Sequence, residues 1–394
     1  MIDYESLLSK RVQALKPSGI RKFFDIAQTM EGVVSLGVGE PDFKTPWAVR
    51  AAAIETLERG RTSYTANAGL LELRKEICNY LNRRFSLSYH PTDETVITVG
   101  GSEAIDLCIR ALIEEGDEVL IVEPCFVAYS PIVEMMHGVP VPIETVAEEH
   151  FRLTPERLRA AITERTKLLV FPYPNNPTGG VMHKEDLEAI AEVLRETNIV
   201  VLSDEIYAEL TYGSRHVSIA SIPGMRERTV VVNGFSKAYS MTGWRLGYAC
   251  GPEPIIQQMT KIHQFAIMCA PTTSQYAAVE ALRRCDEDIE AMAEEYDMRR
   301  RYVVASFNQM GLTCFNPEGA FYAFPCIRST GLSSDEFCER LLYSKKVAVV
   351  PGNAFGASGE GFVRVSYAYS LRHLKEAMKR IAEFLEELKE ERGE

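Results

Sequence analysis

An excess of basic residues is missing from this sequence, and so is any long apolar run. Lys and Arg number 43 against 55 Asp and Glu, which gives a formal charge of −12. This balance argues against nucleic acid or an anionic membrane surface as a main partner, because both require clustered basic side chains. No stretch reaches the ~18 apolar residues of a membrane span, and the first residues do not resemble a signal peptide. We therefore expect a cytoplasmic protein that binds small molecules.

Paired cysteines and paired histidines are also missing. The nine cysteines stand singly, and no two have the spacing Cys-x-x-Cys. Such a pattern is typical of reduced, mostly buried thiols rather than of a disulfide framework. The seven histidines never pair at the spacing of metal ligands. We expect neither disulfides nor a bound metal.

Short runs rich in β-branched residues alternate with longer segments of helical period. This alternation is typical of a mostly parallel sheet wrapped by helices, and the near-continuous apolar character of the runs indicates burial on both faces. The 394 residues are enough for two domains with a core that can seat a buried ligand. The runs are residues 95–99, 118–122, 167–171, 199–202 and 229–232.

The last hundred residues have a different character. A long charged helical segment at 286–301 precedes strand-like pieces at 320–325, 347–351 and 361–368, which predicts a smaller α+β domain. A closing helix is indicated by apolar residues at three- and four-residue spacing from Leu371 to Leu388, followed by a solvated tail from residue 389.

Each predicted strand of the first part ends in a polar or glycine-rich segment. Ligands of open α/β sheets bind outside the carboxyl ends of the strands, so these five segments should converge on one crevice. In the first of them, Gly100-Gly101-Ser102, free N–H groups would meet the positive end of a helix dipole, which is a ready anion site. Taken alone, such a motif is more often a tight turn without a ligand. Ser236 and Arg245 supply further groups for an anion.

Lys237 and Asp204 each follow a buried run. Partial desolvation would lower the pKa of Lys237 and leave a neutral amine for Schiff-base chemistry, although a lone loop lysine is usually a solvated surface charge. Asp204 would either cap a helix that starts near Glu205 or hold a pyridine nitrogen protonated. Tyr207 could direct its phenol to a hydroxyl of the same ring.

These segments, in this order and spacing, resemble the class I and II aminotransferases of pyridoxal-phosphate fold type I. Each motif is weak by itself, whereas their joint order makes coincidence improbable. The resemblance implies a large domain over residues 47–292, with a mostly parallel seven-stranded sheet sandwiched by helices, and a smaller α+β domain formed by 1–46 and 293–394. The matching segments, which span nearly the whole chain, are 37–42, 100–102, 174–179, 204–207, 236–247 and Arg364.

The resemblance also implies how pyridoxal 5′-phosphate would be held. Lys237 would form the Schiff base, Asp204 would pair with the pyridine nitrogen, and Tyr207 and Asn176 would hydrogen-bond the ring oxygen. Phe126 would stack on the ring, unless it is an ordinary core residue. The phosphate would be held by Gly101, Ser102, Glu103, Ser236 and Arg245.

Two further roles follow from the same resemblance. Tyr64 would reach the phosphate of the neighbouring subunit, so the active unit would be a homodimer. Arg364 would bind the substrate α-carboxylate through two parallel hydrogen bonds, with Gly39 and Asn176 completing the pocket. Because an inward carboxylate would repel a phosphate, we expect only the backbone N–H of Glu103 to face it.

The activity implied is ping-pong transfer of an amino group from an L-amino acid to a 2-oxo acid such as 2-oxoglutarate. Segments 16–23 and 62–69 look most similar to a branch that acts on aromatic, aspartate or diaminopimelate-type amino acids. A β-eliminating carbon–sulfur lyase or a decarboxylating synthase of the same fold would share the central residues. A nicotinamide oxidoreductase is disfavoured because Gly37-Val38-Gly39 lacks a third glycine and runs into Pro41. A non-catalytic ligand-sensing regulator is disfavoured because the acidic chain has no added DNA-binding module.

Overall fold

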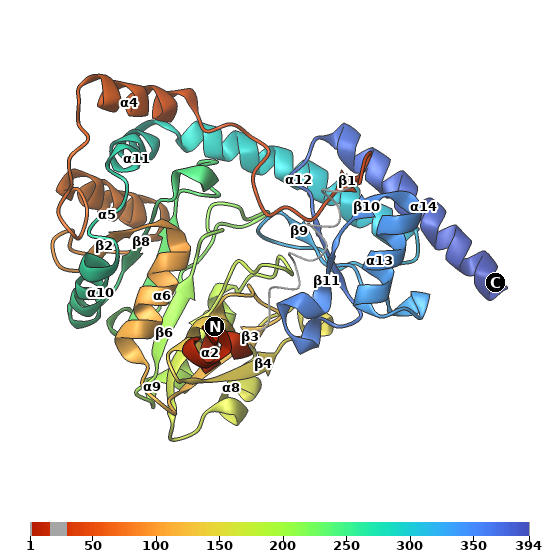
Figure 1. Ribbon diagram of the computed structural model, residues 1–394, viewed down its shortest axis with the longest axis horizontal. Coiled ribbons are helices and arrows are strands. Elements are labelled where there is room, and N and C mark those ends of the chain that lie inside the picture. The colour runs from red at the N-terminus through yellow and green to blue at the C-terminus, as the bar shows by residue number, and fades with distance from the viewer. Residues whose placement is uncertain (1, 16–29, 394) are drawn as a thin grey trace.

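The computed structural model describes residues 2–15 and 30–393, so segment 16–23 lies outside the described residues. Figure 1 shows a larger body around one sheet and a smaller body that combines strand β1 with the last part of the chain. The large sheet has seven strands in the order β2-β8-β7-β6-β5-β3-β4. Within it, β8 runs antiparallel to β2 and β7, and the other pairs are parallel. The predicted α/β fold is therefore confirmed.

All five predicted strands are present, each within two residues at either end. The sequence runs did not indicate β4 and β8. Strand β4 carries Pro140 and Pro142 and lies at the edge of the sheet, where a missing N–H is tolerated. The strands are β2 (Thr95–Thr98), β3 (Glu118–Glu123), β4 (Val139–Glu144), β5 (Thr166–Phe171), β6 (Val200–Asp204), β7 (Thr229–Gly234) and β8 (Gly247–Cys250).

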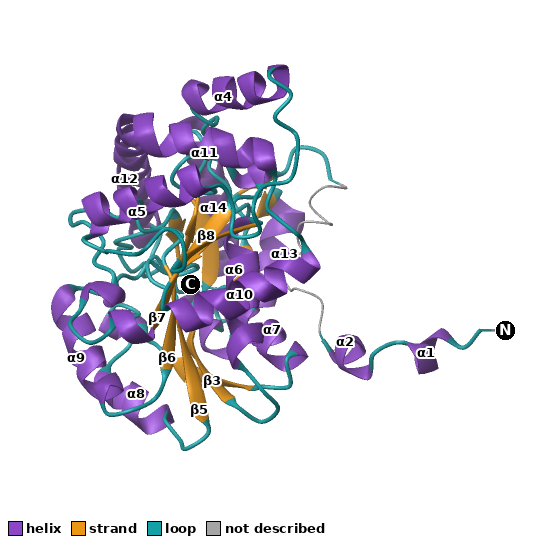
Figure 2. Cartoon of the chain, turned by 90° about the vertical axis from the view of Figure 1, so that its left-hand side faces the viewer, coloured by secondary structure: helices purple, strands orange, loops and turns teal. Residues whose placement is uncertain are grey.

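Helices cover both faces of this sheet because successive side chains of its strands point to opposite sides. In β3, Val119 and Ile121 pack in one apolar cluster with α6, α7 and α10, whereas Leu120 and Val122 pack in another with α8 and α9. Figure 2 shows these two groups of helices on either side of the strands. The helices are α4 (Trp47–Glu58), α5 (Leu71–Phe85), α6 (Gly100–Leu112), α7 (Tyr129–Met135), α8 (Pro155–Ala161), α9 (Lys184–Arg195), α10 (Glu253–Ala266) and α11 (Thr272–Arg284), with α1 (Tyr4–Leu7) and α2 (Lys10–Ala14) near the N-terminus.

The smaller body contains two small sheets. One pairs β1 with β10, and the other has the antiparallel order β11-β12-β9. Its strands are shorter than the sequence predicted. Residues 389–393 are exposed, as expected for a solvated end, but the chain stays helical to Arg392. The elements are β1 (Val34–Ser35), β9 (Tyr322–Ala323), β10 (Val347–Ala348), β11 (Val350–Pro351), β12 (Val363–Ser366), α12 (Asp286–Gln309), α13 (Ser334–Lys345) and α14 (Leu371–Arg392).

Helix α12 joins the two bodies. Ile289, in its first turn, belongs to the apolar cluster of the large body, whereas Met292 and Tyr296 belong to that of the smaller one. We propose that the domain boundary lies at residue 292 and that 1–46 and 293–394 form the small domain, although α2 contacts the large body, where Arg11 donates to the backbone of Glu134 in α7. Among the described residues, every helix is too short or too polar to traverse a lipid bilayer.

Candidate active site

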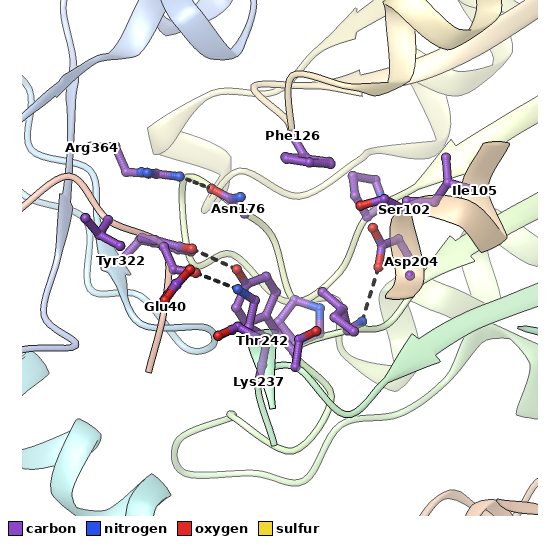
Figure 3. A pocket seen from close by; sticks show the side chains of 18 of the residues that line it. Glu40, Ser102, Ile105, Phe126, Asn176, Asp204, Lys237, Thr242, Tyr322 and Arg364 are labelled. Atoms are coloured by element: carbon purple, nitrogen blue, oxygen red, sulfur yellow. Dashed lines mark hydrogen bonds between the residues drawn. The ribbon is translucent and has the colours of Figure 1, made fainter. Parts of the chain in front are cut away.

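A cavity of about 760 Å³ lies between the two bodies, at the carboxyl ends of the central strands. The segments that follow β2, β3, β5, β6 and β7 all contribute to its wall, which confirms the predicted convergence of five loops. In Figure 3, Asp204 and Arg364 lie on opposite sides of the cavity. The predicted site residues that line it are Gly39, Gly101, Ser102, Phe126, Asn176, Asp204, Tyr207, Ser236, Lys237, Arg245 and Arg364.

Lys237 follows β7 and carries the amine of the cavity. Its Nζ donates a hydrogen bond to the carbonyl oxygen of Gly39 at 2.5 Å. The pKa of Lys237 is lowered from 10.5 to about 8. Burial is the main cause of this lower pKa, Glu40 opposes it, and the positive charges of Arg364 and Arg245 contribute to the lowering. A substantial fraction of neutral amine is therefore present slightly above neutral pH, which is the form that attacks a carbonyl carbon.

Asp204, the last residue of β6, is buried with 8% of its surface exposed. The phenol of Tyr129 donates to one carboxylate oxygen at 2.7 Å, and the N–H of Ile206 donates to the other at 3.2 Å. Burial raises the pKa of Asp204, while the hydrogen bond from Tyr129 acts in the opposite direction. The pair of donors stabilises a buried anion that can still accept a bond from a protonated ring nitrogen.

Of the two roles considered for Asp204, helix capping is not observed, because no helix begins near Glu205. The chain forms a turn after Asp204, because the carboxylate accepts from the N–H two residues on and so closes a side-chain turn in place of a helix cap. The turn still carries Tyr207 to the cavity.

The phenol of Tyr207 meets the phenol of Tyr322 at 2.8 Å, and both side chains are buried. A Cβ at Gly39 would come within 2.6 Å of the Tyr322 oxygen, so this position admits only glycine without a shift of the ring. Tyr322 comes from β9 of the smaller body and was not indicated by the sequence. The two tyrosines therefore connect the wall of the large body to that of the small one.

Arg364, on β12, is buried with 4% of its surface exposed. Its guanidinium donates to the side-chain oxygen of Asn176 at 2.9 Å and to the carbonyl of Gly37 at 2.6 Å, and it lies 4.5 Å from the ring centroid of Tyr322. Its Nε is buried without a hydrogen-bond partner among the described residues. A buried guanidinium with a free donor is suited to a carboxylate ligand.

The opposite end of the cavity is built to hold an anion. Helix α6 begins at Gly100, so the backbone N–H groups of Gly101 and Ser102 stand in its first turn at the cavity wall. Gly100 has φ +77°, and a Cβ there would lie 2.8 Å from the guanidinium of Arg245. Arg245 thus lies beside the helix N-terminus, and Ser236 adds a hydroxyl. First-turn amides, hydroxyls and a guanidinium together form a cradle for a phosphate.

Two predicted site residues do not line the cavity of the single chain. Glu103 lies in α6, and its carboxylate accepts from the N–H of Val99 at 2.5 Å and contacts Nδ1 of His263 at 2.8 Å. Tyr64 is 82% exposed and stands apart from the cavity wall. The structure of one chain therefore does not bring Tyr64 to the site.

Two tyrosines that the sequence did not single out stand at the site, namely Tyr129 and Tyr322, and Glu40 of the matching segment 37–42 lines it as well. Tyr129 lies only three positions after Phe126, so its place in the same loop was a usable signal. Tyr322 comes from a segment with no local motif, and the packing of the smaller body against the sheet brings it to the cavity.

Comparisons with known proteins agree with this geometry. The sequence profile described as "Aminotransferase class I and II" matches residues 31–381. The Bacillus subtilis protein YugH, named provisionally as an aminotransferase, is 56% identical over 96% of this chain and 98% of its own length. An aspartate aminotransferase of Pyrococcus abyssi is 46% identical over 97% of this chain and 99% of its own.

A solved structure gives the same answer. The crystal structure of an aromatic aminotransferase from Pyrococcus horikoshii superposes with a TM-score of 0.90 at 44% identity, covering 93% of this chain and 99% of that one. The cavity, the fold and the sequence profile agree over nearly the full length. The chain therefore belongs to the class I and II aminotransferases.

Proposed function

We propose that this aminotransferase depends on pyridoxal 5′-phosphate and moves an amino group from an L-amino acid to a 2-oxo acid such as 2-oxoglutarate in a ping-pong cycle. One observation carries the proposal. A partly buried amine, Lys237, and a buried carboxylate, Asp204, face the same cavity, which has an anion cradle at one end and Arg364 at the other.

The residues of the cavity fit this cofactor. The first turn of α6, with Ser102, Ser236 and Arg245, would hold the phosphate. Asp204 would accept from the protonated pyridine nitrogen, and each of these opposite charges would favour the ionised form of the other at a site where solvent screens little. Tyr207 and Asn176 would bond the ring oxygen, and Phe126 would stack on the ring.

When bound, the cofactor supplies an electron sink for the pair left at the substrate α-carbon. The chain's own residues do the rest. Arg364 orients the α-carboxylate, with Gly39 and Asn176 beside it. Lys237, whose pKa of about 8 makes the free amine accessible, takes the α-proton and returns it. Proton transfer of this kind contributes ~10² to 10⁴ in rate.

The donor is proposed to be an aromatic, aspartate or diaminopimelate-type amino acid. The support comes from two relatives, one named an aspartate aminotransferase and the other an aromatic aminotransferase, at similar identity. Aromatic and acidic amino acids have the same α-carboxylate and α-amino group, which are the parts that Arg364 and Lys237 would contact. The other residues that line the cavity would determine which substrate side chain is accepted.

We also propose a homodimer in which Tyr64 reaches the partner's phosphate site. Large apolar side chains stand exposed in the segment that ends α10, including Phe265 at 84% and Met268 at 45%. Tyr64 belongs to the same region, because the backbone of Ser63 accepts from Thr272 and Asn67 donates to the backbone of Met268. Exposed apolar surface of this kind is typical of a protein interface.

The proposal is tested by a panel of amino donors supplied with 2-oxoglutarate. We expect one equivalent of 2-oxo acid per amino acid consumed and no free ammonia, with no turnover by Lys237→Ala. Release of ammonia with pyruvate would instead indicate the β-eliminating lyase. Mixing Tyr64→Ala with Lys237→Ala protein tests the dimer, because only a mixed dimer contains one site with both residues intact. Partial recovery of activity is expected, and its absence would contradict the shared site.

A further inference from the structure

A buried carboxylate–imidazole pair ties the start of α6 to α10. Glu103 accepts from the N–H of Val99, the residue that precedes α6, through one carboxylate oxygen at 2.5 Å. Its other oxygen lies 2.8 Å from Nδ1 of His263, which is on α10 and 0% exposed. Both oxygens of Glu103 are therefore engaged, and Glu103 does not line the cavity.

The tautomer of this histidine follows from its surroundings. An ionised carboxylate can only accept, so the shared hydrogen sits on Nδ1 of His263. Its Nε2 is buried without a hydrogen-bond partner among the described residues. The only bond that orients the ring is thus the one to Glu103, and α10 in turn gives Glu103 a fixed partner.

The bond from Glu103 closes the turn that carries the anion-binding N–H groups. Gly101 and Ser102, whose N–H groups form the cradle, stand between Val99 and Glu103 in the same turn. A bond from the Glu103 side chain back to the N–H of Val99 closes this turn on itself, as in a helix capping box. A glycine-rich turn has much conformational freedom to lose, so such a closure preorganises the donors of an anion site.

We propose that Glu103 and His263 are positioning residues that hold the first turn of α6 in the conformation that binds the cofactor phosphate. This rests on the proposed function, since it assumes that the cradle holds a phosphate. Neither side chain contacts the phosphate in this role. The carboxylate acts through the turn that it closes, and the imidazole acts by holding the carboxylate.

The test compares pyridoxal 5′-phosphate with pyridoxal, which lacks only the phosphate. The dissociation constants of both are measured on the full-length, cofactor-free protein by quenching of tryptophan fluorescence. The dissociation constant of pyridoxal divided by that of pyridoxal 5′-phosphate is the ratio that reports the contribution of the phosphate. A general loss of folding would weaken the binding of both compounds alike and leave this ratio unchanged. Glu103→Gln keeps an oxygen for the N–H of Val99, whereas Glu103→Ala has none, and the two variants carry the same charge.

We expect the ratio of Glu103→Ala to fall about tenfold below that of Glu103→Gln, the size of effect of one lost helix-cap hydrogen bond. His263→Leu should also lower the ratio, and His263→Asn, which keeps a donor near the Nδ1 position, should restore it in part. Glu336→Gln is the matched control, because Glu336 closes a capping box on α13, away from the cavity. Its ratio should equal that of the wild type.

Equal ratios for Glu103→Ala and Glu103→Gln, with normal wild-type binding, would overturn the inference alone. A ratio for His263→Leu equal to that of the wild type would overturn the positioning role of His263. A wild-type protein that binds neither compound would overturn the proposed function, and the inference with it.

Discussion

The charged, desolvated amine of Lys237 should make the cofactor-free wild type less stable at pH 7 than a variant with an uncharged side chain at this position. Its pKa is lowered from 10.5 to about 8, mainly by burial, and each pKa unit corresponds to about 1.4 kcal/mol. The charged amine therefore costs the fold about 3 kcal/mol at pH 7. Lys237→Met keeps the length of the side chain and removes the charge, at the loss of the hydrogen bond to Gly39, worth about 1 kcal/mol. The net gain expected at pH 7 is about 2 kcal/mol.

The pH dependence of this gain gives the sharper test. Between pH 8 and 10.5 the unfolded chain binds more protons at this lysine than the folded protein, so the wild-type free energy of unfolding rises with pH over this window. The advantage of Lys237→Met should be full below pH 8 and shrink above it. Urea unfolding of both proteins, without cofactor, at several pH values measures the difference.

The control is Lys379→Met, because Lys379 is an exposed lysine with only a distant ion pair to Glu383. It should change stability by less than about 0.5 kcal/mol at any pH. A Lys237→Met variant that is no more stable than the wild type, or whose advantage does not vary with pH, would refute a buried, desolvated amine.

Three further changes test single contacts of the site. Tyr129→Phe removes the phenol donor of Asp204, which raises the pKa of that carboxylate, so turnover should fall ~10-fold or more and the acid limb of its pH profile should move to higher pH. Tyr173→Phe, which removes a buried phenol bonded to a backbone carbonyl elsewhere, should lower stability and leave the profile in place. Arg364→Lys should raise KM for amino acids by ~10-fold or more, because an ammonium cannot give two parallel bonds, and steady-state kinetics measures it. Gly247→Ala should weaken cofactor binding ~10-fold or more in a fluorescence titration, because its Cβ would lie 2.5 Å from the backbone at the start of α6.

Local sequence patterns predicted most strands of the large body and the site residues that follow them. The buried runs ending at Asp204 and near Lys237 were visible because parallel strands are apolar on both faces, and the loops after them must then meet at one edge. Strand β8 was missed because a four-residue segment that begins with glycine has no period to detect. A helix after Asp204 was one of two alternatives because acidic residues often cap helices, and the structure has a turn there, closed by a bond to the same carboxylate.

Contacts between distant segments were beyond the reach of sequence patterns. Nothing near Tyr322 indicates that its phenol meets Tyr207, 115 positions earlier. The same holds for His263, which lies 160 positions from Glu103. Such pairs are set by how helices and sheets pack on one another, and that packing depends on all side chains of the interface.

Glu40 shows what such a distant contact does to the chemistry. Its carboxylate raises the pKa of Lys237, second in size to burial and opposed by Arg364 and Arg245. Glu40→Gln should therefore lower the pKa of that amine further and increase the neutral fraction at pH 7. The rate at which pyridoxal modifies Lys237, followed against pH, should have its midpoint at a lower pH in the variant. Because Glu40 is exposed at the mouth of the cavity, added salt should reduce the difference. A midpoint that does not move at low salt would mean that burial alone sets the basicity of the amine.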